Sequence, residues 1–116
     1  MESQQSYLVE ITPEAEYHYL ELGEYLYQHH APSAADKKLT EILDLAISLE
    51  NRPNRGRVEE KLSLLGKDHR FLVYSYTSRK SIKVIYFVEE SIKKVYVTDF
   101  FPTEMNDDKI LKRTGL

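Results

Sequence analysis

Three closely spaced runs of β-branched and aromatic residues fill the second half of the chain and constrain its fold most strongly. They cover residues 70–77, 82–89 and 93–101, and each is rich in Val, Ile, Tyr or Phe, the residue types that favour strands. The connections, 78–81 and 90–92, have the length of hairpin loops. Strands joined by such short loops pair antiparallel. The sequence therefore predicts an antiparallel meander.

Two amphipathic segments precede these runs and predict a pair of helices. Thr12-Pro13-Glu14 supplies an N-cap, a proline for the first helical position and an acid in the first turn. Apolar residues then recur at spacings of three and four until Pro32 ends the segment. We expect Ser33 to cap the second helix, with Asp36 replacing the Glu of a capping box, and residues 51–56 to end it. The tight link between them predicts an antiparallel αα-hairpin.

The order of the segments defines a fold class. Residues 7–11 (YLVEI) predict a short first strand, 62–65 a loop or brief extended piece, and 107–111 the start of a short terminal helix. The predicted order is therefore β-α-α-β-β-β, an α+β domain whose αα-hairpin packs on one face of a largely antiparallel sheet. With 116 residues, we expect residues 1–116 to form a single domain.

The second β-rich run is apolar on both of its faces. Val84, Tyr86 and Val88 point to one side, and Ile85 and Phe87 point to the other. A strand with one wet face alternates apolar and polar residues more cleanly than this.

The third run repeats the feature, with Val95 and Val97 opposite Tyr96 and Phe100. Two helices can cover only one face of the sheet. We therefore expect the C-terminal tail, another subunit or a separate protein to shield the second face.

Composition excludes some functional classes and disfavours others. There is no Cys, and hence no disulfide framework, thiol nucleophile or Cys-based zinc site, which fits a reducing cytoplasm. The net charge of −3 disfavours a phosphate-gripping role. The start, MESQQSYLVEI, lacks the features of a signal peptide, and no apolar stretch has the length of a membrane span. We expect a cytoplasmic protein without membrane, metal or cofactor.

The best basic cluster lies around the central hairpin. It comprises Arg70, Arg79, Lys80 and Lys83, which a sheet hairpin could bring together. Basic residues at a hairpin tip are also the ordinary decoration of a solvated loop. His69, beside Arg70, is the histidine best placed for acid–base chemistry.

The ordered set of segments resembles the RelE/ParE superfamily of toxins from bacterial type II toxin–antitoxin modules, and within it the ParE-like, plasmid-stabilisation branch. The patches that carry the resemblance are EITPEAEYHYLEL, APSAADKKLTEILDLAISLENRPNRGR, HRFLVYSY followed by IKVIYFV, and VYVTDFFPTEMNDDKI. They extend from about Val9 to Ile110. The resemblance implies a compact toxin domain, neutralised by an antitoxin that wraps an extended or helical segment around it.

The resemblance implies two modes of action. ParE-like members poison DNA gyrase, which is the function we expect here, together with growth inhibition. RelE-like members cut messenger RNA on the ribosome without a metal. In that alternative Lys83 and Arg70 would stabilise phosphate charge, and His69 or Tyr86 would transfer a proton.

Two departures from the family pattern weaken the ribonuclease alternative. Lys83 aligns with the family's sheet Arg and is a less specific phosphate ligand than a guanidinium. Glu104 stands where an Arg is usual, and a carboxylate repels phosphate. Glu104 also motivates a third alternative, a member that keeps the fold and antitoxin binding without toxicity.

The resemblance also implies a partner surface on the sheet and C-terminal segment. Tyrosine is a preferred interface residue because it combines apolar area with a polar group. The residues we expect to contact the antitoxin are Tyr74, Tyr76, Tyr96, Phe100, Phe101 and Glu104. The sequence leaves open whether the assembly is a homodimer or a toxin–antitoxin hetero-oligomer.

Overall fold

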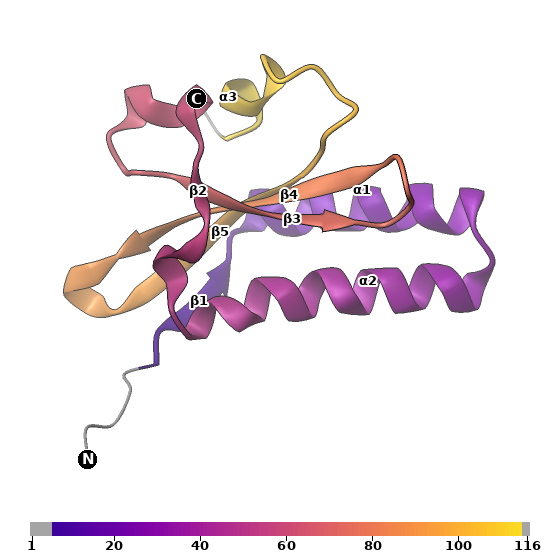
Figure 1. Cartoon of the computed structure of the whole chain (residues 1–116), viewed down its shortest axis with the longest axis horizontal. Coiled ribbons are helices and arrows are strands. Elements are labelled where there is room, and N and C mark those ends of the chain that lie inside the picture. The colour runs from indigo at the N-terminus through magenta and orange to yellow at the C-terminus, as the bar shows by residue number, and fades with distance from the viewer. Residues whose placement is uncertain (1–5, 115–116) are drawn as a thin grey trace.

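Two helices lie side by side and form the predicted hairpin (Figure 1). The computed structural model describes residues 6–114; the beginning of the chain, which the signal-peptide prediction partly concerns, and residues 115–116 lie outside this range. Helix α1 (Pro13–His29) begins as predicted, since Thr12 Oγ1 accepts a hydrogen bond from the Ala15 amide at 3.2 Å.

Helix α2 (Pro32–Ile47) begins earlier than predicted. Its N-cap is Ala31, without a side-chain hydrogen bond, and the expectation that Ser33 caps the helix is wrong. Proline fits the first helical position because its φ is already helical and it lacks the amide that would be unpaired there. Asp36 instead accepts a hydrogen bond from the Tyr27 hydroxyl, which links α2 to α1.

The sheet has five strands in the order β1-β5-β4-β3-β2 (Figure 1). Strands β2 (Arg57–Val58), β3 (Arg70–Ser75), β4 (Ser81–Glu89) and β5 (Lys94–Pro102) pair antiparallel. Strand β1 (Leu8–Ile11) pairs parallel with β5. The predicted α+β class with two helices against a largely antiparallel sheet is confirmed, and the two-residue β2 is an addition that the sequence did not signal.

The main core lies between the helices and the sheet. Leu22 and Leu26 of α1 and Ile42 of α2 pack with Val84 of β4 and Val95 of β5, and all five side chains are buried. Burying a side chain of this kind contributes about 1.5–3 kcal/mol relative to leaving it exposed.

A register shift in β5 corrects one predicted strand face. Ile85 lies opposite Asp99 while Tyr86 lies opposite Val97, so one extra residue is inserted in β5 at Thr98. Such a bulge reverses the side-chain alternation beyond it. Phe100, expected on the face opposite to that of Val97, therefore packs with Val97 in the helix-side core.

The centre of the second face is covered by the chain itself. Residues 62–65, expected as a loop or brief extended piece, belong instead to a 3-10 helix (Glu60–Leu65), and the C-terminal segment contains helix α3 (Lys109–Arg113). Figure 1 shows both on the side of the sheet away from the α1–α2 hairpin. They lay Leu62 and Ile110 on Ile85 and Phe101, and these four side chains form a second buried cluster.

The ends of the second face stay open. Phe87 and Tyr96 are half-buried, while Leu8 is 66% exposed and Val73 is 53% exposed. The C-terminal tail, one of the three candidates expected to shield this face, covers its centre together with the 3-10 helix. A partner protein can therefore contact only the periphery of this face.

Candidate functional site

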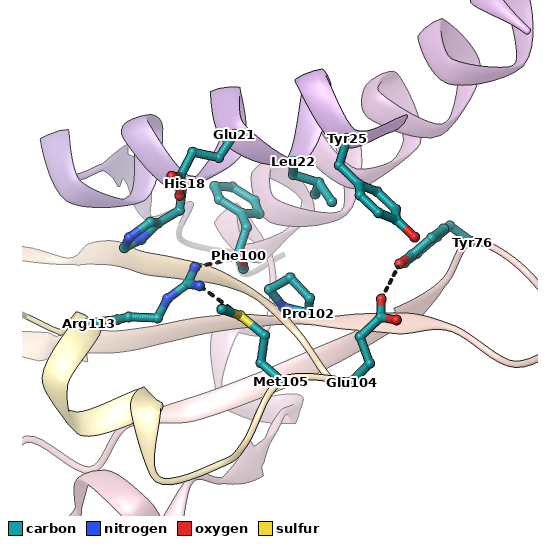
Figure 2. Close-up of a pocket in the computed structure, with 10 residues that line it drawn as sticks. All are labelled: His18, Glu21, Leu22, Tyr25, Tyr76, Phe100, Pro102, Glu104, Met105 and Arg113. Atoms are coloured by element: carbon teal, nitrogen blue, oxygen red, sulfur yellow. Dashed lines mark hydrogen bonds between the residues drawn. The ribbon is translucent and has the colours of Figure 1, made fainter. Parts of the chain in front are cut away.

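A groove runs between α1 and the segment that connects β5 to α3 (Figure 2). It encloses about 280 Å³, and its floor is apolar, made by Leu22, Phe100, Pro102 and Met105. In Figure 2, His18 and Arg113 lie toward one end, and Tyr25, Tyr76 and Glu104 toward the other. The groove thus combines an apolar floor with a few polar groups, the usual composition of a binding site.

A buried carboxylate organises the first end. Asp99 is fully buried and accepts hydrogen bonds from Arg113 Nε at 3.1 Å and Nη2 at 2.7 Å. The His18 Nδ1 lies 3.2 Å from Asp99 Oδ1, without the alignment of a hydrogen bond. Because a buried carboxylate is stable only when paired, this bidentate contact fastens α3 to β5.

A hydrogen-bonded network organises the other end. The Tyr76 hydroxyl donates to Glu104 Oε1 at 3.0 Å, and Lys80 Nζ donates to the Tyr25 hydroxyl at 2.8 Å and lies 3.5 Å from Glu104 Oε2. Burial and, second, the Glu104 carboxylate raise the pKa of Tyr76, which therefore remains a donor at neutral pH. Glu104 thus has partners within the protein, and Lys80 of the hairpin tip takes part in the same network.

The residues expected to act in RNA cleavage do not converge. Arg70 pairs with Tyr86 across β3 and β4, and Lys83 is three residues from Tyr86, so Lys83 and Arg70 lie on opposite faces of the sheet. Lys83 Nζ forms an ion pair with the buried Glu59 carboxylate at 2.8 Å. Arg70 Nη1 donates to the Gly56 carbonyl at 3.0 Å. Both cations are engaged in internal contacts.

The two expected proton-transfer groups are enclosed by the protein. The fully buried Tyr86 hydroxyl donates to the Pro53 carbonyl and accepts from the Gly56 amide at 3.0 Å, and burial raises its pKa. His69 is 2% exposed and packs against the ring of Phe87. Burial is the main cause that lowers the pKa of His69. Neither group is presented to a substrate in this structure.

The expected partner-contact residues divide into core and surface. Phe100 and Phe101 are fully buried in the two clusters, and Tyr76 is 3% exposed, so all three pack mainly inside the fold, although Tyr76 and Phe100 also line the groove. Phe100 lies in the helix-side core against Tyr19 of α1, whereas Phe101 is buried with Ile110 of α3. Tyr74 is half-buried, and its hydroxyl donates to Glu41 of α2.

Tyr96 and Glu104 keep accessible surface in different places. Tyr96 is half-buried and stacks on Phe87 on the second face, with 5.2 Å between ring centroids. Glu104 is exposed at the groove. The six expected residues therefore do not form one continuous patch.

The residues that build the groove's first end were not predicted from the sequence. Asp99 stands between valine, threonine and phenylalanine residues in an apolar strand, and an acid in such a run is a signal for a buried, paired charge. Its partners, His18 and Arg113, carry no comparable signal, because only the fold brings α1 and α3 to the end of β5.

Within residues 6–114, no cluster of three or more His, Asp or Glu residues is arranged to hold a metal ion. Over the same residues, no helix combines the length and the apolar character that crossing a bilayer requires.

Comparison with known proteins gives one match. Residues 9–106 match the family described as the ParE toxin of type II toxin–antitoxin system, parDE. The match covers most of the chain, including both helices of the hairpin, β1 from Val9 onward, strands β2 to β5 and the groove-lining residues up to Met105, whereas α3 lies beyond it. No curated protein and no solved structure matches the chain.

Proposed function

Because the chain belongs to the ParE toxin family of type II toxin–antitoxin systems, we propose that it acts by binding other proteins. A cognate antitoxin neutralises it, and DNA gyrase is its target, the action that the resemblance to ParE-like toxins implies. Both are proteins of the bacterial cytoplasm, where this toxin would work. Free toxin inhibits growth, and bound toxin does not.

The separation of Lys83 from Arg70 is the observation that carries the proposal. Ribonuclease action without a metal requires cationic groups that converge on one phosphate together with an accessible acid or base. Here the two cations lie on opposite faces of the sheet, and each has partners within the protein. This arrangement supports protein binding over RNA cleavage, and the net charge of −3 supports it further.

The outer edge of β3 supports a site for an extended antitoxin segment. Strand β2 pairs only with Arg70 and Phe71, so β3 has no strand neighbour on that side from Leu72 to Ser75. Such an edge can add a strand from another chain through main-chain hydrogen bonds. Val73, 53% exposed, stands at this edge.

Controlled expression in a bacterial host tests the function. The chain is induced alone and together with the product of the adjacent open reading frame, and growth, the DNA-damage response and messenger RNA integrity are followed. Purified protein is added to a gyrase supercoiling assay. We expect growth arrest, DNA-damage induction, intact messages, inhibited supercoiling and rescue by a copurifying neighbour.

The alternatives predict different results. Cleaved messages that become intact in a Lys83→Ala/Arg70→Ala double variant would replace gyrase inhibition by ribonuclease action. Normal growth at a confirmed soluble yield would indicate a non-toxic member of the family. If neither adjacent gene product binds the chain, the antitoxin part of the proposal fails.

A further inference from the structure

Helix α1 carries a one-sided negative charge. It contains Glu14, Glu16, Glu21 and Glu24 and has no Lys or Arg. All four glutamates are exposed, and none forms an ion pair with another residue of the described range 6–114. By contrast, Glu104, the other acid that lines the groove, forms an ion pair with Lys80.

Three of these glutamates form a stripe with an exposed aromatic ring. Glu14, Glu21 and Glu24 recur at spacings of seven and three, which places them on one side of the helix. Tyr17, 60% exposed, lies between them on the same side. We call Glu14, Tyr17, Glu21 and Glu24 the acidic stripe.

The acidic stripe is continuous with the groove. Glu21 belongs to both, because it lines the groove above the apolar floor of Leu22, Phe100 and Met105 (Figure 2). Two cationic side chains of α3, Lys112 and Arg113, line a shallow cavity with Glu14 and Tyr17, but neither forms an ion pair with the stripe, and Arg113 is held by Asp99. The surface therefore offers an apolar cavity of about 280 Å³ bordered by unpaired negative charge.

From these features we infer that the acidic stripe and the groove dock a basic segment of the cognate antitoxin. An apolar side chain of that segment enters the groove, and Lys or Arg residues lie opposite Glu21 and its neighbours. The inference rests on the proposed toxin function and specifies the chemistry of the partner. Complementary charge speeds encounter and excludes acidic competitors, because like charges placed face to face are repulsive.

A second copy of the chain fits the surface less well. A symmetric contact between two copies places the same patch on both sides. The acidic stripe would then meet another acidic stripe with no Lys or Arg on α1 to separate the charges. A basic partner removes this repulsion.

Charge-neutral variants test the inference on the intact chain. Glu21→Gln/Glu24→Gln removes two charges from the stripe, and the control Glu50→Gln/Glu60→Gln removes two exposed charges elsewhere. Binding to the adjacent gene product is measured by isothermal titration calorimetry at 50 and 300 mM NaCl. Each exposed ion pair contributes roughly 1.5- to 5-fold in affinity, so we expect the stripe variant to bind about 3- to 20-fold more weakly at low salt.

The control variant should bind within about twofold of the wild type, and the difference between the variants should shrink at high salt. Equal binding by both variants overturns the inference while leaving the toxin function intact. Failure of the wild type to bind the adjacent product counts against the proposed function instead.

A peptide pair then decides the charge preference of the surface directly. Two fluorescein-labelled amphipathic peptides of equal length share one leucine pattern, and one carries lysine and the other glutamate at the polar positions. We expect the lysine peptide to bind the wild type more tightly than the stripe variant, by fluorescence polarisation. Preference for the glutamate peptide, equal binding of both peptides, or a wild-type dimer that the stripe variant abolishes would overturn the inference.

Discussion

Replacing Arg113 by methionine isolates the contribution of the ion pair at the end of the groove. Asp99 has no exposed surface, and its two carboxylate oxygens accept hydrogen bonds from the Arg113 guanidinium at 2.7 and 3.1 Å. Methionine keeps an unbranched apolar side chain but removes the guanidinium, and with it both donors to Asp99 and the stacking on the Phe101 ring. The imidazole of His18 then remains beside Asp99, with Nδ1 3.2 Å from Oδ1 but without the alignment of a hydrogen bond.

The expected cost is large relative to the stability of a domain of this size. Breaking a buried ion pair by removing one partner costs about 3–5 kcal/mol, against a total stability of about 5–15 kcal/mol. Since Arg113 keeps 14% side-chain exposure and water can reach the site, we expect the lower end, about 3 kcal/mol. Helix α3 should loosen first, because the pair fastens it to β5.

Urea unfolding followed by circular dichroism measures the free energy of unfolding, and hydrogen exchange of residues 109–113 measures the local effect. The double variant Asp99→Asn/Arg113→Met serves as a control, since removing the charge of both partners should cost less than Arg113→Met alone. A loss below about 1 kcal/mol for Arg113→Met, or a double variant less stable than the single one, would refute the view that this pair holds the C-terminal segment in place.

Three further predictions concern the folded state. Gly56→Ala should destabilise the protein by about 1–3 kcal/mol in urea unfolding, because a Cβ there would stand 2.5 Å from the buried Tyr86 hydroxyl oxygen and 2.8 Å from the Phe71 carbonyl oxygen. Gly23→Ala is the control and should be tolerated, because its nearest contact would be at 3.5 Å. Equal losses of stability in the two variants would contradict this prediction. Burial lowers the pKa of His69, so the unfolded chain binds more protons than the folded chain near pH 6, and the stability that His69 contributes above its ordinary pKa is lost as pH falls below it. His69→Gln should therefore reduce the fall in the free energy of unfolding between pH 7.5 and 5.5. An unchanged fall would contradict this prediction. Lys83→Met should cost about 3 kcal/mol by leaving Glu59 buried and unpaired, and adding Glu59→Gln should recover part of that loss; no recovery would contradict the structural role assigned to this pair.

Local signals account for what could be predicted before the fold was known. The α1 start was predicted because Thr12 and Pro13 act within one turn of the chain, and the antiparallel meander because its connecting loops are short. The N-cap at Ser33 was wrong because Pro32 can itself begin a helix. The 3-10 helix of residues 60–65 was missed because its apolar residues find their contacts only in α3 and the sheet.

The candidate sites could not be predicted from residue types alone. Arg70 and Lys83 are close in sequence and of like charge, yet strand register places them on opposite faces. Phe100 and Phe101 have the chemistry of an interface, but the helix-side core buries Phe100, and the cluster that includes Ile110 of α3 buries Phe101.

The sequence by itself determined the order and type of the main elements, the α+β class and the presence of two apolar sheet faces, because capping, periodicity and loop length act over a few residues. Only the tertiary structure decided what covers the second face, where Asp99 meets Arg113, and that the charge of α1 borders an apolar groove. These features depend on the register of strands and on contacts between segments distant in sequence, and neither leaves a pattern along the chain.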